Sequence, residues 1–64
     1  MKLLKLTSHN DNKPIVINAK KIIYMYESRH NKEFMFTRIL LSGYSSEVKV
    51  IDRLEDIVEK INNE

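Results

Sequence analysis

Short apolar runs, some of them alternating with polar residues, follow one another along this chain and are separated by polar clusters. Alternation with a period of two is typical of strands that bury one face. The pattern predicts five strands, over residues 2–7, 14–18, 22–27, 34–41 and 44–51. Turn-forming clusters at 8–13, 19–21 and 28–33 separate the first four, and Ser42-Gly43 precedes the last. Gly43 suits a tight turn because it tolerates a positive φ.

After Ile51 the period changes from two to 3.6, which predicts one helix over about 52–62. Asp52 is predicted as its N-cap, with Glu55 at capping-box spacing. The apolar residues expected to face the core are Leu54, Ile57, Val58 and Ile61. The predicted fold class is α+β: a small, strongly bent antiparallel sheet or partial barrel of about five strands with one C-terminal helix, in a single domain over 1–64.

The third and fourth strands are apolar on both faces, as expected of central strands covered on both sides. A hairpin centred on Asn31 would pair Arg29 with Glu33 and Tyr26 with Phe36. Side-chain parity then assigns one face to Ile22, Tyr24, Tyr26, Phe34, Phe36 and Leu40, and the other to Ile23, Met25, Thr37, Ile39 and Leu41. A one-residue bulge would change this assignment.

One short helix covers only one face of such a sheet. A chain of 64 residues without cysteine buries only about 60% of its unfolded surface, so its stability is marginal unless something else covers it. We therefore expect a homo-oligomer. The predicted interface or binding face comprises Tyr24, Tyr26, Phe34, Phe36, Arg38 and Leu40.

Charge is divided unevenly along the chain. Residues 1–46 carry a net charge of +5 and residues 47–64 a net charge of −3, within a total of +2. The basic strands either favour a polyanion or steady the acidic helix against the sheet. The candidate polyanion contacts are Arg29, His30, Lys32 and Arg38. Together with the aromatic rings, they indicate an alternative function, single-stranded nucleic-acid binding through an aromatic-basic sheet face.

Catalytic and metal chemistry finds little support in the sequence. His9 and His30 lie in predicted turns, and zinc needs at least three protein ligands. Ser45 and Ser46 have no nearby histidine, and a single glycine excludes a glycine-rich phosphate loop. We expect no enzyme activity and no catalytic, cofactor-binding or metal-binding residues. The longest apolar run, 22–26, is too short to span a membrane, and no signal peptide is evident, so we expect a cytoplasmic protein.

Several short motifs resemble the small flagellar FlbD-like family of short bacterial and phage proteins. They are Ile15-Val16-Ile17-Asn18, Thr37-Arg38-Ile39-Leu40-Leu41 with the turn at Ser42-Gly43, and Glu47-Val48-Lys49-Val50 before the helix. The resemblance extends over nearly the whole chain. It implies a small β-rich fold with a terminal helix and no catalytic residue. The family commonly has a polar residue where this chain has Ile23, Tyr24 or Tyr26.

These observations favour a non-catalytic binding or adaptor module that acts through protein–protein contacts. The high Asn, Lys and Ile content favours a bacterial or phage origin, in which case an adaptor or an inhibitor of a host protein is a natural role. A pocket for a small anionic ligand between subunits is a further possibility.

Overall fold

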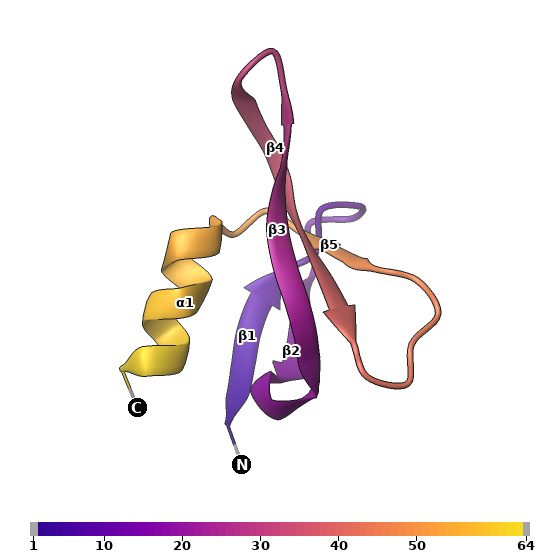
Figure 1. Cartoon of the computed structure of the whole chain (residues 1–64), viewed down its shortest axis with the longest axis vertical. Helices are drawn as coiled ribbons and strands as arrows, with labels where there is room; N and C mark the ends of the chain where they lie inside the picture. The colour runs from indigo at the N-terminus through magenta and orange to yellow at the C-terminus, as the bar shows by residue number, and fades with distance from the viewer. Residues whose placement is uncertain (1, 64) are drawn as a thin grey trace.

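The computed structural model describes residues 2–63, which form five strands, one 3₁₀ turn and one α-helix (Figure 1). The elements are β1 (Leu3–Thr7), β2 (Pro14–Asn18), η1 (Ala19–Lys21), β3 (Ile22–His30), β4 (Glu33–Leu41), β5 (Val48–Val50) and α1 (Leu54–Asn62). Every predicted strand and the predicted helix is present, which confirms the α+β class, but the fifth strand covers only Val48–Val50 of the predicted 44–51. The strands form two antiparallel sheets, β1-β2 and β3-β4-β5, rather than one closed barrel.

The first hairpin follows the alternation seen in the sequence. Leu4 and Leu6 are buried while Lys5 between them is exposed. Leu4 pairs with Ile17 across the hairpin, so the apolar residues of both strands share one face. This hairpin therefore supplies one wall of the core.

The second hairpin turns more tightly than the sequence predicts. Only Asn31 and Lys32 separate β3 from β4, and both have positive φ, 51° and 69°. His30 therefore pairs with Glu33, and Tyr26 pairs with Arg38 rather than with Phe36. The predicted register was wrong because a two-residue turn replaces the longer loop expected at 28–33.

Two bulges alter which residues share a face. Ile23 is an extra residue in β3, since Ile22 pairs with Leu41 and Tyr24 with Leu40. Its insertion places Ile22 against the core and leaves Ile23 60% exposed, the reverse of the predicted assignment. Met35 is the extra residue in β4, where Ser28 pairs with Phe36 and Arg29 with Phe34. Between the two bulges the predicted faces are correct.

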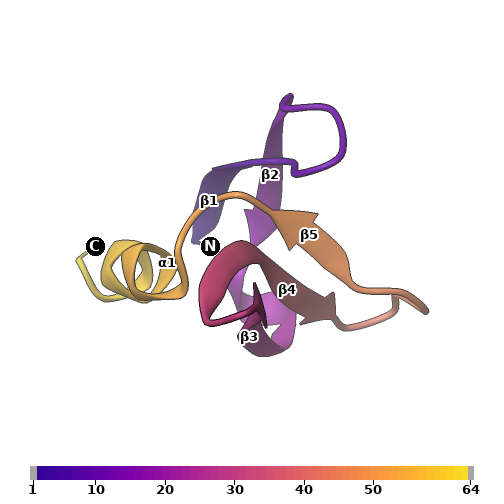
Figure 2. The same cartoon turned by 90° about the horizontal axis from the view of Figure 1, so that it is seen from above.

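The two sheets meet where β1 ends and β5 ends. Ser8 forms an isolated bridge to Val50, and the N–H of Ile51 donates to the carbonyl of Thr7 at 2.9 Å. From above, the sheets diverge from this junction and α1 lies on the open side between β1 and β3 (Figure 2). The predicted single bent sheet is therefore replaced by two sheets that meet at this junction, with α1 packed against β1 and β3.

The core lies between the two sheets and the helix. Its buried apolar residues are Leu4, Leu6, Ile17, Ile39, Leu41, Val50 and Ile57. Thr37, which pairs with Val50, is buried as well. Ile57 is fully buried, whereas Val58, predicted to face the core, is 41% exposed. Ile57 and Ile61 pack in and against the core and Leu54 is half-buried, so the buried stripe is narrower than predicted.

The helix N-terminus differs from the predicted capping box. Arg53 occupies the N-cap position without a side-chain hydrogen bond. Asp52 instead accepts a hydrogen bond from the N–H of Thr7 at 2.8 Å and lies 3.7 Å from Lys60, which joins the helix to β1. The Asp52 prediction was wrong because a strand edge competes for that carboxylate.

Candidate interaction face

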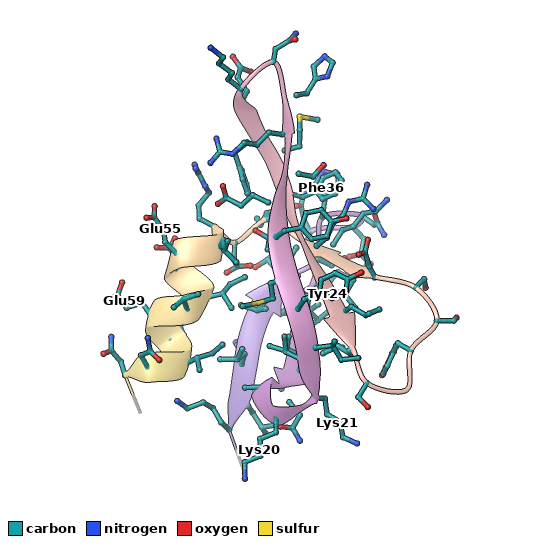
Figure 3. All side chains as sticks on the ribbon, in the orientation of Figure 1. Lys20, Lys21, Tyr24, Phe36, Glu55 and Glu59 are labelled. Carbon is teal, nitrogen blue, oxygen red and sulfur yellow. The ribbon has the colours of Figure 1, made fainter. Side chains whose placement is uncertain are left out.

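One side of the β3-β4-β5 sheet faces away from the core. We call it the tyrosine face; its members are Tyr24, Tyr26, Phe36, Arg38, Leu40, Glu47 and Lys49. In Figure 3 the labelled Tyr24 and Phe36 project from the hairpin on the side away from α1. Tyr24 is 46% and Tyr26 43% exposed, and their ring centroids lie 6.0 Å apart. The face therefore presents two adjacent aromatic rings to solvent.

Glu47 lies at the centre of the polar groups on this face. Its carboxylate accepts hydrogen bonds from the hydroxyls of Tyr24 at 2.8 Å and Tyr26 at 3.3 Å. Arg38 Nη1 donates to the same carboxylate at 3.2 Å. The hydrogen bond from Tyr24, with help from Arg38, lowers the pKa of Glu47, and the same bond raises the pKa of Tyr24. Glu47 thus orients both tyrosines and neutralises one cation.

Phe36 is surrounded by cations and a second ring. The Arg38 guanidinium carbon lies 5.1 Å and Lys49 Nζ 5.3 Å from its ring centroid, both within cation–π range. The His9 ring, from the β1–β2 turn, lies 4.7 Å away between centroids. Phe36 is only partly exposed as a result, so the two tyrosines provide most of the free aromatic surface.

Phe34 does not belong to the tyrosine face. Because Met35 is bulged, Phe34 pairs with Arg29 and lies on the helix side of the sheet. The Arg53 guanidinium carbon lies 4.3 Å from its ring centroid, so the start of α1 covers it. The prediction that Phe34 shares a face with Tyr24 and Tyr26 is corrected accordingly.

The candidate polyanion contacts are dispersed. Arg29 pairs with Glu27 on the helix side, and Arg38 pairs with Glu47 on the tyrosine face. His30 and Lys32 are exposed at the end of the hairpin that projects at the top of Figure 1. These four side chains do not form one basic surface.

The predicted binding face lacked two members of the tyrosine face, Glu47 and Lys49, and the neighbouring His9. Glu47 and Lys49 alternate with Val48 and Val50, so burial of the valines places the two charges on the tyrosine face. This signal was present in the sequence. His9 reaches Phe36 only because its N–H donates to the carbonyl of Lys49 at 2.9 Å, a contact between distant segments with no local signal.

Within residues 2–63, no cluster of three or more His, Asp or Glu side chains is arranged to hold a metal ion. In the same part of the chain, no helix has the length and apolar character needed to cross a membrane.

Comparisons of the chain with protein-family models, curated proteins and solved structures found no match. The resemblance to the FlbD-like family therefore stays a prediction.

Proposed function

We propose that this protein is a non-catalytic binding module that self-associates through the tyrosine face and acts through protein–protein contacts. The observation that carries the proposal is the pair of adjacent tyrosines, 46% and 43% exposed, on the sheet side that α1 does not cover.

The small core supports a need for additional burial. Seven apolar residues are buried within residues 2–63. The accessible surface is 4643 Å², whereas a compact monomer of 7.6 kDa exposes about 4,300 Å². A second copy on the tyrosine face would remove apolar surface from water and stabilise both subunits.

The chemistry of the tyrosine face suits a protein interface. Tyrosine, phenylalanine and arginine are the residue types enriched in such interfaces. The pairing of Arg38 with Glu47 reduces the net charge that would have to be desolvated. A standard interface covers about 800 Å² on each partner. A two-fold dimer would pack this face against its own copy and would need to bury an area of that size.

Single-stranded nucleic acid is the alternative partner, supported by Arg38 and Lys49 beside the Phe36 ring. Two features weigh against it. Glu47 places a carboxylate among the cations, and the Phe36 ring is already flanked by His9. Stacking on a base needs an aromatic surface free of such neighbours.

Sedimentation velocity tests the proposal. We expect the wild-type chain to sediment as a species heavier than 7.6 kDa, and a Tyr24→Ser/Tyr26→Ser variant to sediment as a monomer. Tyr44→Ser is the matched control, because Tyr44 is 63% exposed but lies in the loop before β5. Circular dichroism gives the folded fraction of each variant, which we expect to be lower for the double variant than for the control.

A folded wild-type monomer at every concentration would overturn the proposal, as would a double variant that associates like the control. Fluorescence anisotropy with a labelled oligothymidylate tests the alternative. Salt-sensitive binding that Arg38→Glu and Lys49→Glu abolish, without association of the free protein, would favour nucleic acid.

A further inference from the structure

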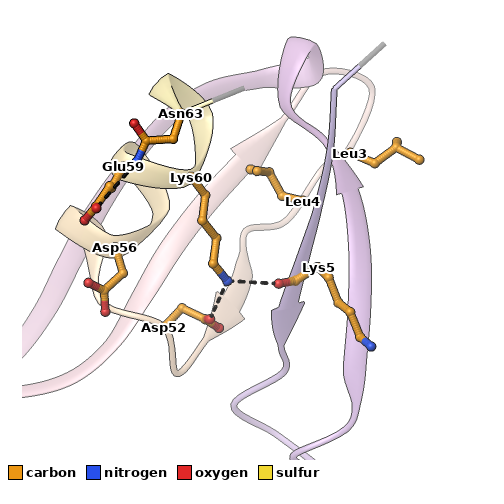
Figure 4. Close-up of a pocket in the computed structure, with 8 residues that line it drawn as sticks. All are labelled: Leu3, Leu4, Lys5, Asp52, Asp56, Glu59, Lys60 and Asn63. Carbon is orange, nitrogen blue, oxygen red and sulfur yellow. Dashed lines mark hydrogen bonds and ion pairs between the residues drawn. The ribbon is translucent and has the colours of Figure 1, made fainter.

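A groove of about 610 Å³ runs between β1 and α1 (Figure 4). Leu3, Leu4 and Lys5 line one side, and Asp56 and Glu59 of α1 lie on the other. Its volume is within the range of roughly 300–1,000 Å³ typical of ligand sites. The groove lies apart from the tyrosine face, and of its lining residues Leu4 also belongs to the core.

The edge of β1 that borders this groove is only partly paired. The carbonyl of Lys2 and the N–H of Ser8 form hydrogen bonds on the β2 side. The backbone N–H and carbonyl groups of the even-numbered residues therefore point toward β2, and those of Leu3, Lys5 and Thr7 point toward the groove. Thr7 is satisfied there, since its N–H donates to Asp52 and its carbonyl accepts from Ile51. Within residues 2–63, no hydrogen bond engages the N–H or carbonyl of Leu3 or the N–H of Lys5.

Lys60 covers the remaining edge group. Its Nζ donates to the carbonyl of Lys5 at 3.3 Å and lies 3.7 Å from Asp52 (Figure 4). Both contacts are long, and the Lys60 side chain is 48% exposed. An ammonium held in this way exchanges readily with another hydrogen-bond donor.

The groove is acidic although the chain as a whole is basic. Three carboxylates line it, those of Asp52, Asp56 and Glu59, against the amines of Lys5 and Lys60. In Figure 4 the Lys5 side chain points away from α1, whereas Lys60 reaches toward β1 and the Asp56 and Glu59 carboxylates lie beside α1, where Glu59 accepts a hydrogen bond from Asn63 at 3.4 Å. Displacement of Lys60 would increase the negative charge of the groove.

We propose that the groove binds an extended segment of another protein that carries lysine or arginine, added as a strand to the β1 edge. The segment's backbone N–H replaces Lys60 at the carbonyl of Lys5, and its carbonyl accepts from the N–H of Lys5. Its basic side chains pair with Asp56 and Glu59. The unpaired strand edge supplies the backbone contacts, and the acidic wall selects the charge. This site is independent of self-association through the tyrosine face.

Nuclear magnetic resonance titration of the ¹⁵N-labelled chain tests this inference. The probe is an eight-residue peptide of alternating lysine and valine, and the charge control alternates glutamate and valine. We expect the basic peptide to shift the Leu3 and Lys5 amides and to bind about tenfold more tightly than the acidic one. Equal binding of both peptides, absence of binding, or shifts confined to other strands would overturn the inference.

Two N-methylated versions of the basic peptide distinguish binding by backbone hydrogen bonds from binding by charge attraction alone. One is methylated at every lysine nitrogen and the other at every valine nitrogen. An added strand uses one of its two edges, so we expect one probe to lose binding and the other to keep it. Two probes that bind like the parent peptide would show charge attraction alone and contradict strand addition.

Lys60→Ala provides the test in the protein. We expect it to bind the basic peptide about threefold more tightly, because it removes a competitor for the Lys5 carbonyl and one positive charge. Lys32→Ala removes the same charge at the hairpin end and is expected to leave binding unchanged. Weaker binding by Lys60→Ala would contradict the role assigned to Lys60.

Discussion

The Glu27 carboxylate on β3 accepts a hydrogen bond from the backbone N–H of Leu54, the first residue of α1, at 3.1 Å. The first N–H groups of a helix have no partner within the helix, and a negative charge there also interacts favourably with the helix dipole. Glu27 thus acts as an N-terminal cap supplied by a strand 27 residues away. The same carboxylate pairs with Arg29 and Arg53, which fixes the start of α1 against the sheet.

Replacement of Glu27 is expected to destabilise the fold more than replacement of Glu55. Glu27→Ala removes the cap from the Leu54 N–H, and we expect the Tm to fall by about 4–8 °C. Glu55→Ala is the matched control, because Glu55 is exposed and makes no capping hydrogen bond. Thermal unfolding followed by circular dichroism measures both. A larger loss in Glu55→Ala would mean that the capping box operates after all.

Stability is expected to fall in acid through two carboxylates. The hydrogen bond from Leu54 lowers the pKa of Glu27, and the hydrogen bond from Tyr24 lowers that of Glu47, relative to the usual 4.5. The unfolded chain therefore binds protons at a higher pH than the folded chain does. This stabilisation is fully present above about pH 4.5 and is lost as the pH falls through the lower folded values.

Urea unfolding at a series of pH values measures this dependence. We expect the Glu27→Gln/Glu47→Gln variant to be less stable than wild type at pH 7 and to lose less stability between pH 5 and about pH 3. An acid dependence as steep as that of wild type would show that other groups carry the effect.

Lys32→Gly is expected to stabilise the β3–β4 hairpin. Lys32 has φ of 69° beside Asn31 at 51°, a two-residue turn in which glycine is favoured. Relief of the left-handed conformation outweighs the added backbone entropy, for a net gain of about 1 kcal/mol and a Tm increase of about 5 °C. Lys20→Gly is the control; Lys20 lacks a positive φ, so the same change there should destabilise. A lower Tm for Lys32→Gly would contradict this account.

Thr37→Val is expected to cost about 1–2 kcal/mol of unfolding free energy. The Thr37 side chain is fully buried, and its hydroxyl donates to the carbonyl of Asp52 at 2.6 Å. Valine fills the same space but leaves that carbonyl without its donor. Thr7→Val is the control, since the Thr7 hydroxyl makes no hydrogen bond within residues 2–63. Urea unfolding compares the two, and a Thr37→Val variant as stable as wild type would remove the role assigned to this bond.

The order of the elements was predictable because each run carried its own period. Leu4 and Leu6 alternate with Lys5, and Ile57 and Ile61 follow helical spacing, so local pattern and tertiary burial agree. Val58 was predicted to face the core, but it is 41% exposed. The short helix contacts the sheets along a narrower stripe than the spacing of its apolar residues suggests.

The register of the central hairpin was not predictable from local signals. The usual sequence signal of a two-residue turn is glycine after asparagine, whereas lysine follows Asn31 here. The bulges at Ile23 and Met35 have no glycine or proline to mark them. Beyond each bulge the residues on the two faces of the strand are exchanged. For this reason Phe34 lies on the helix side of the sheet and not on the tyrosine face.

The remaining features that were not predicted depend on contacts between residues far apart in the sequence. The sequence around Glu27 does not indicate that its carboxylate caps a helix beginning at Leu54. Nor does the sequence around Asp52 indicate that its carboxylate accepts a hydrogen bond from the N–H of Thr7. Glu47 and Lys49 were the missed members of the tyrosine face that alternation alone would have placed there.

Coverage of the tyrosine face by a second copy is tested by a dilution series of the wild-type chain. Light scattering gives the mass at each concentration, and circular dichroism gives the folded fraction. We expect the mass to fall toward 7.6 kDa on dilution, with a loss of folded protein over the same range. A mass of 7.6 kDa at every concentration, with the chain fully folded, would contradict the claim.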